Sequence, residues 1–206
     1  MTAPPALLFI SSWIPEELVD EFAEWCDAHQ RGLATVPGLR RARRFVLEEA
    51  PPADVPDMLT MYEVDSIELA GTDLWRERGF AHGPLPVAIT GRLRSSRRDL
   101  TVVAALPTRW WPPRPSQRLD LFTLADRRSV DRLVAAFDAV TTDVPLPVTV
   151  RLLDGEGGPP LVLIDHHDDE GDDLIDLLTD ASGANTSRWS VVFDIAGPGS
   201  GTGDAP

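Results

Sequence analysis

The chain has 206 residues, a formal net charge of −14 from 33 acidic and 19 basic residues, and a hydrophobic fraction of 43%. This length can bury a substantial core, as one large domain or two small ones. The acidic surface disfavours binding to nucleic acids and to anionic membranes. Every basic residue is arginine, so Schiff-base chemistry on lysine is excluded.

The single cysteine, Cys26, cannot form an intramolecular disulfide, which suits a reducing compartment. The N-terminal stretch MTAPPALLFISSW has no basic segment and only a short apolar run, so we do not expect it to be a signal peptide. No run of the sequence approaches the length of a membrane span. We therefore expect a soluble, cytoplasmic protein with no membrane partner.

The first half of the chain alternates between strand-like and helix-like segments. Proline followed by two glutamates at positions 15–17 is typical of a helix N-terminus, and Pro37-Gly38 of a turn. The predicted strands are 6–13, 39–49, 57–65 and 99–107, and the predicted helices run from Pro15 to about His29 and over 66–79. The order β-α-β-β-α-β is the ferredoxin-like arrangement.

The same order returns after a junction rich in proline and bulky aromatic residues. The predicted strands are 118–125, 146–154, 159–167 and 187–195, and the predicted helices are 127–140 and 168–181. A glycine-rich tail follows, which favours disorder. We predict an N-terminal unit over 1–107, a linker over 108–116, a degenerate C-terminal unit over 117–196 and a disordered tail over 197–206.

A four-stranded ferredoxin-like sheet is covered by its helices on one face and is bare on the other. Two such sheets can bury their bare faces against each other. The sequence therefore predicts an α+β fold of two tandem βαββαβ units whose antiparallel sheets pack face to face. Because this internal pseudo-dimer buries both faces within one chain, the protein could exist as a monomer or as a homodimer.

Four short motifs occur in order within residues 6–80: E-F-x-x-W-C-D-x-H, V-P-G, R-x-R-R-F and M-Y-E-V-D. Together they resemble a group within the dimeric α/β-barrel superfamily. That superfamily includes antibiotic-biosynthesis monooxygenases, EthD-like proteins, muconolactone isomerases and plant-type polyketide cyclases. The second half matches only in element order. Two departures concern the first motif: Cys26 replaces the usual aromatic residue, and the spacing from Asp27 to His29 is one residue shorter.

His29 closes an apolar stripe formed at helical spacing by Leu18, Phe22 and Trp25. The resemblance implies that this face lines a pocket between helix and sheet. A histidine there with a pKa near neutrality could move protons to and from an enolisable carbon or a phenol. The alternative is a histidine at a helix end that hydrogen-bonds to a loop carbonyl.

Two further residues are candidates for polarising a substrate carbonyl. On a strand, Arg41 and Arg43 share one face and Arg44 lies on the other, and the resemblance favours Arg44 as the inward one. The alternative for most of the three is a solvated cationic edge. Tyr62, the only tyrosine, could donate a hydrogen bond. Its alternative role is a core aromatic whose hydroxyl reaches the surface.

The remaining candidates are apolar. Cys26 has no nearby base in the sequence, so a small buried residue is the expected role. Tryptophans could line a site for a flat aromatic ligand, although core packing explains them equally well. The predicted substrate-binding residues are Leu18, Phe22, Trp25, Cys26, Trp13 and Trp75.

The acidic run DHHDDEGDD at 165–173 does not favour a metal site. Adjacent histidines on a strand point apart, and the glycine does not fit the register of a calcium-binding loop. The chlorite-dismutase group, which shares the tandem fold, binds haem. However, no histidine of the second half lies on a helix with an apolar face. We therefore expect neither a metal nor a cofactor.

These observations favour a cofactor-independent enzyme of secondary metabolism that acts on a hydrophobic aromatic or polyketide-like small molecule. The expected reaction is proton transfer by His29, as in a cyclase, an isomerase or a lyase that dehydrates its substrate, with Tyr62 or Arg44 polarising the carbonyl. One alternative is a cofactor-free monooxygenase of the same superfamily. The other is a non-catalytic module that binds a small molecule or a protein.

Overall fold

The computed structural model describes residues 6–47, 56–105, 118–124, 128–132, 135, 149–155, 158–166 and 185–198. The chain folds as two compact units. The first unit comprises Met1–Val46, Ala50–Asp99 and Val192–Pro206, and the second comprises Leu47–Glu49 and Leu100–Val191.

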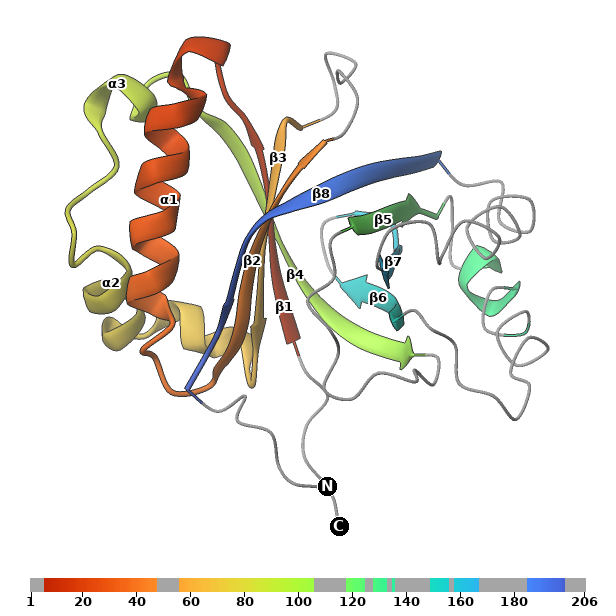
Figure 1. The fold of residues 1–206 in the computed structure, drawn as a ribbon. Helices are drawn as coiled ribbons and strands as arrows, with labels where there is room; N and C mark the ends of the chain where they lie inside the picture. The colour runs from red at the N-terminus through yellow and green to blue at the C-terminus, as the bar shows by residue number, and fades with distance from the viewer. Residues whose placement is uncertain are drawn as a thin grey trace. The chain divides into compact units, whose positions relative to one another are not determined.

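The first unit has the predicted β-α-β-β-α-β order (Figure 1). Its strands are β1 (Ala6–Trp13), β2 (Leu39–Leu47), β3 (Met58–Val64) and the first part of β4 (Arg94–Ala105), whose residues from Leu100 onwards belong to the second unit. Its helices are α1 (Val19–Leu33), α2 (Asp73–Gly79) and α3 (Val87–Thr90), with 3₁₀ turns η1 (Glu16–Leu18) and η2 (Ile67–Gly71). β3 is the central partner, because β1 and β2 both pair with it in antiparallel fashion and bring Leu8 and Ala42 opposite Tyr62.

The helix α1 is longer than predicted, since it ends at Leu33 and not near His29. Its buried residues, Phe22, Cys26, Gln30 and Leu33, follow the spacing of one helical face, and this face continues past His29. The chain then turns through Gly38, whose φ of 90° is a left-handed conformation that glycine adopts without steric cost.

The prediction of one continuous helix over 66–79 is wrong. Thr72 has an extended backbone, which separates η2 from α2, and its hydroxyl accepts a hydrogen bond from the Trp75 amide. Threonine competes with helix continuation in this way because its side chain caps the helix that follows it. The helix α2 therefore begins at Asp73, after the break, and ends at Gly79.

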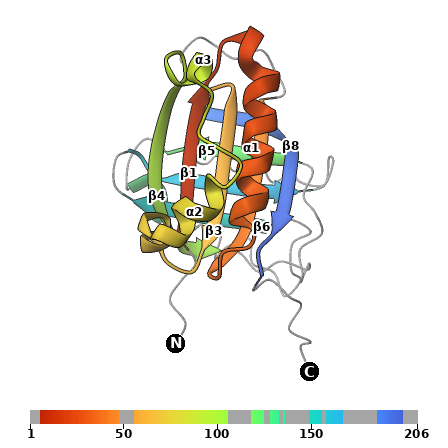
Figure 2. The same ribbon diagram turned by 90° about the vertical axis from the view of Figure 1, so that its left-hand side faces the viewer.

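The helices of the first unit lie on one face of its sheet (Figure 2). α1 and α2 approach closely at Gly32, where a Cβ atom would lie 2.1 Å from the carbonyl oxygen of Arg78. Two buried clusters fill the space between helices and sheet. The first contains Leu8, Leu33, Leu39, Ala42, Tyr62 and Trp75, among others, and the second contains Ile14, Leu18, Phe22, Cys26, Met58 and Ile89.

The second unit contains β5 (Arg118–Thr123), β6 (Thr149–Gly155), β7 (Leu161–His166) and the first part of β8 (Asn185–Ala196). β5 pairs with β7 and with β8, and β6 pairs with β7, all antiparallel. Residues 128–132 are helical, as predicted for the start of the helix over 127–140. The predicted helix over 168–181 lies outside the described residues.

The paired strands follow the order β1-β3-β2-β8-β5-β7-β6-β4 and close into an eight-stranded barrel. The predicted fold class, an α+β antiparallel barrel of tandem ferredoxin-like units, is confirmed. The boundaries at 107, 116 and 196 stay a prediction. In the part of the chain that the structure describes, no helix is long and apolar enough to cross a membrane.

Candidate functional site

Four rings from α1, β3 and the segment after α2 gather around the ring of His29. The His29 ring stacks on Trp25, with centroids 4.8 Å apart and planes inclined by 17°. Phe80, His82 and Tyr62 present edges to it at centroid distances of 5.2, 6.2 and 6.4 Å. We call Trp25, His29, Tyr62, Phe80 and His82 the His29 cluster.

The two nitrogens of the His29 ring have different roles. Nδ1 lies 2.7 Å from the carbonyl oxygen of Gly79, the last residue of α2. Because a carbonyl can only accept, Nδ1 carries the proton and Nε2 is left with a lone pair. No hydrogen bond of the described residues ends on Nε2. Glycine at position 79 permits this approach, since a Cβ atom there would lie 2.7 Å from the ring carbon Cε1 and the ring would have to shift.

Burial lowers the pKa of His29 to about 4, an effect larger than the opposing influence of the Gly79 carbonyl. The sequence predicted a pKa near neutrality, so the ring is a weaker base than expected. It is therefore neutral at physiological pH, with its Nε2 lone pair always available.

The His29 cluster reaches the protein surface on the side of α2. Phe80 is 46% exposed and His82 is also exposed, whereas Trp25 and His29 are half-buried. Such a gradient, from buried to exposed rings, provides an apolar surface against which a flat molecule can stack. Sequence reasoning missed Phe80 and His82 because both follow the helix and belong to no periodic pattern.

Arg44 points from β2 towards α1, as the resemblance implied. Its side chain is 5% exposed, its NH2 group lies 2.5 Å from Asp27 Oδ1, and its NH1 group donates to the carbonyl of Ala23 at 3.1 Å. Asp27 thus holds Arg44, and it is the Gly79 carbonyl that holds His29.

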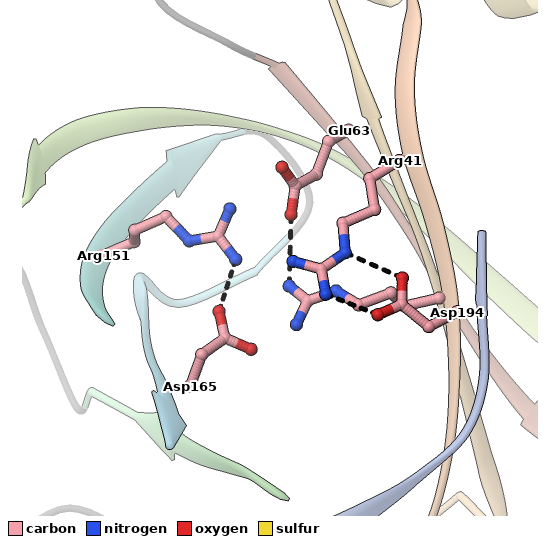
Figure 3. A network of polar contacts seen from close by, with 6 residues as sticks. Arg41, Glu63, Arg151, Asp165 and Asp194 are labelled. Atoms are coloured by element: carbon pink, nitrogen blue, oxygen red, sulfur yellow. Dashed lines mark hydrogen bonds and ion pairs between the residues drawn. The ribbon is translucent and has the colours of Figure 1, made fainter. Parts of the chain in front are cut away.

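Arg41 and Arg43 lie on the opposite face of the same strand, and they are not a solvated edge. Arg43 is fully buried, and its NH2 group lies 3.1 Å from Glu63 Oε1. Arg41 forms a two-point contact with Asp194 of β8 through Nε and NH2, at 2.8 and 2.5 Å. The expectation of a solvated cationic edge is wrong, because each guanidinium has a carboxylate partner that lies far from it in sequence (Figure 3).

Tyr62 and Cys26 are both buried in the layer between α1 and the sheet. Burial raises the pKa of Tyr62 well above its ordinary value and that of Cys26 to about 12, and the Arg44 guanidinium opposes both shifts only in part. Tyr62 is therefore a hydrogen-bond donor, and Cys26 is a protonated thiol without nucleophilic character. As a whole residue Tyr62 is 3% exposed, so its ring lies in the core.

The apolar residues predicted to bind substrate do not all lie together. Leu18 and Phe22 pack with Cys26 in one cluster, and Trp75 meets Tyr62 edge to face at 5.4 Å. Trp13 instead lies under the guanidinium of Arg94, 4.0 Å from the ring centroid. By strand alternation, Trp13 faces away from α1, since its neighbour Ser12 pairs with Met58 of the helix-facing cluster.

Gln30 is a third residue that the sequence analysis did not identify. It is fully buried on the sheet-facing stripe of α1, and neither its Oε1 nor its Nε2 has a hydrogen-bond partner among the described residues. The signal for its burial was present, because Gln30 continues the spacing of four from Phe22 through Cys26.

The second unit has polar pairs of its own. Arg151 of β6 donates to Asp165 of β7 at 2.7 Å (Figure 3). His166 and Asp120 are both fully buried, with Nε2 and Oδ2 2.5 Å apart. Among the described residues, no three histidine, cysteine, aspartate or glutamate side chains gather as metal ligands. Most of the acidic run at 165–173 lies outside those residues.

No protein-family model matches the sequence, and no curated protein matches it significantly. Solved structures do match over nearly the whole chain. A presumed monooxygenase of Fusobacterium nucleatum superposes with a TM-score of 0.60 at 12% identity, covering 95% of this chain and 96% of its own. An anthrone oxidase-like protein superposes with a TM-score of 0.54 at 11% identity, covering 98% of this chain and 97% of its own.

A haem-binding protein of Thermus thermophilus also matches, with a TM-score of 0.55 at 10% identity and coverage of 92% of each chain. At these identities the matches establish the fold alone, which is the dimeric α/β-barrel fold implied by the motifs. His166 does not fit the role of an axial haem ligand, because its ring is fully enclosed and its Nε2 is engaged by Asp120. The adjacent His167 lies outside the described residues.

Proposed function

We propose that this chain is a cofactor-independent enzyme that moves a proton on a hydrophobic aromatic or polyketide-like small molecule, with His29 as the base. The observation that carries the proposal is the orientation of the His29 ring, with Nδ1 on a backbone carbonyl and Nε2 uncommitted within the His29 cluster. A flat substrate stacks on the exposed edge of that cluster and presents an acidic C–H or O–H to Nε2.

The hydrogen bond from His29 to the Gly79 carbonyl suits a structural ring and is also compatible with a base. After Nε2 accepts a proton, the imidazolium keeps its Nδ1–H bond to the Gly79 carbonyl, which favours the charged form. The enolate or phenolate formed beside the ring adds a second favourable charge. A base with a pKa of about 4 is weak, which restricts the reaction to substrates whose hydrogen is already acidified by an adjacent carbonyl or aromatic ring.

A second candidate function begins with the same proton transfer. The enolate of an electron-rich substrate can react with O₂, and two matched structures carry the descriptions of a presumed monooxygenase and an anthrone oxidase-like protein. For anthrone, the C10 methylene would become a carbonyl while O₂ supplies that oxygen and one molecule of water. This reaction balances without a further reductant.

The test uses 9-anthrone, whose C10 hydrogens are acidified by the C9 carbonyl. Exchange of these hydrogens into D₂O under nitrogen, followed by NMR, measures the proton transfer, and an oxygen electrode measures O₂ uptake in air. In His29→Phe a ring remains to stack but the nitrogen is lost, so we expect exchange to fall by about 100-fold or more. His82→Phe is the matched comparison within the same cluster, because it removes an exposed ring nitrogen from the stacking surface while the proposed base stays in place.

The possible results of these assays distinguish the three candidate functions. Exchange without O₂ uptake supports the proton-transfer enzyme, and exchange with O₂ uptake supports the monooxygenase. Anthrone binding without either reaction supports the third alternative, a small-molecule-binding module. If His29→Phe exchanges as fast as the unmodified protein, His29 is not the base.

A further inference from the structure

Gln30 places an amide in the packed layer between α1 and the sheet. Its side chain is fully enclosed, and both of its polar atoms lack a partner among the described residues. A buried amide without partners is destabilising, so its presence in a packed layer requires an explanation. The other buried positions of the same helical face, Phe22, Cys26 and Leu33, hold apolar or weakly polar side chains.

The position of Gln30 relates it to the proposed site. Leu33, almost one turn after it, packs in the same buried cluster as Tyr62. Gln30 therefore lies over the part of the sheet that carries Tyr62, and Tyr62 is also an edge partner of His29. His29 and Gln30 are adjacent on α1, so their side chains diverge by about 100° around the helix axis.

Building on the proposed function, we propose that Gln30 is a second catalytic residue, whose side-chain N–H donates a hydrogen bond to the carbonyl oxygen of the substrate. In anthrone the C10 hydrogens and the C9 oxygen lie on opposite sides of the central ring, which matches the divergence of the two side chains. When His29 takes a proton from C10, the electron pair moves through the ring to the C9 oxygen, which becomes an enolate oxygen. A donor already placed at this oxygen stabilises the charge as it develops.

In Gln30→Met, which keeps the length of the side chain and removes its polar atoms, we expect stability and activity to change in opposite directions. Without ligand the variant is more stable, with a melting temperature raised by about 3–6 °C, because the cost of the unpartnered amide disappears. At the same time, anthrone exchange falls by about 10- to 100-fold, as expected for the loss of one donor to a developing oxyanion.

A pair of ligands tests the contact directly. 9,10-Dihydroanthracene has the rings of anthrone without its carbonyl, and binding of both can be followed by quenching of tryptophan fluorescence. The unmodified protein binds anthrone about tenfold more tightly than dihydroanthracene, and Gln30→Met binds the two equally. The His29→Phe variant keeps the preference for anthrone, since its Gln30 is unchanged.

The outcomes separate this inference from the proposed function. If Gln30→Met loses stability and exchanges anthrone at the normal rate, the amide is satisfied by buried water and has no role in catalysis, although His29 can still be the base. Equal binding of the two ligands by the unmodified protein also overturns the inference. If His29→Phe is fully active, the proposed function fails whatever the result at Gln30.

Discussion

At the scale of single residues, helical spacing predicted that the face carrying His29 packs against other elements, and the edge contacts of its ring with Tyr62 and Phe80 agree with this. Its partner could not be predicted, because Gly79 is 50 residues away and contributes only a backbone carbonyl. The pKa of His29 could not be predicted from the sequence either, since it depends on how completely the surrounding residues exclude water from the ring.

The lowered pKa of His29 makes the stability of the protein depend on pH. The folded ring has a pKa of about 4 and the unfolded ring one of 6.5, so between these values only the unfolded state binds the proton. Stability is therefore full above about pH 6.5 and falls as the pH drops towards 4, by at most about 3 kcal/mol.

Urea denaturation between pH 7 and pH 5 measures this dependence, and His29→Phe should show a shallower decline than the unmodified protein. The exchange rate of anthrone should in turn stay level from pH 8 to pH 5, because Nε2 remains unprotonated. An exchange rate that rises steeply around pH 6.5 would contradict the lowered pKa.

At the scale of elements, strands were easier to predict than helix ends. β1 matches its predicted range because its apolar run is bounded by proline on both sides. The break at Thr72 was missed, since a threonine between two helical patterns gives no local sign of whether it caps or continues a helix. The two arginine faces of β2 were assigned correctly by alternation, but their carboxylate partners come from other strands.

The contact between α1 and α2 should be sensitive to the size of residue 32. In Gly32→Ala, the new methyl group would meet the Arg78 carbonyl, so α2 must move away. We expect a net loss of about 1–3 kcal/mol of stability, despite the higher helix propensity of alanine. Because α2 carries Gly79, the exchange rate should fall as well.

Gly71→Ala is the matched control, because a Cβ atom at position 71 meets no other atom within 4 Å. Thermal unfolding and the anthrone exchange assay measure both effects. Equal stability of the two variants would show that the α1–α2 spacing is not fixed by this contact.

At the scale of the whole molecule, the order of elements was enough to predict the barrel, since each unit repeats one pattern. The path of the last strand was not predictable from that pattern. The end of β8 belongs to the first unit: Asp194 binds Arg41, Ile195 packs in the Leu8–Tyr62 cluster, and the Gly197 amide donates to the Arg40 carbonyl at 2.8 Å.

A fragment of residues 1–107 should therefore be much less stable than the same residues in the intact chain. It lacks the strand that follows β2 in the barrel and leaves Arg41 without its carboxylate. We expect a lower urea midpoint, or no cooperative transition, by circular dichroism. A midpoint equal to that of the full chain would instead show that the predicted boundary at 107 separates an independent domain.

The bond between His29 and Gly79 has a practical consequence. Neutral histidine in water prefers to carry its hydrogen on Nε2, whereas the carbonyl of Gly79 selects the rarer form with hydrogen on Nδ1. The two forms differ in their nitrogen and carbon chemical shifts. Any compound that displaces the end of α2 will release this selection, so isotope-labelled histidine provides a built-in reporter of occupancy that requires neither a dye nor a known reaction.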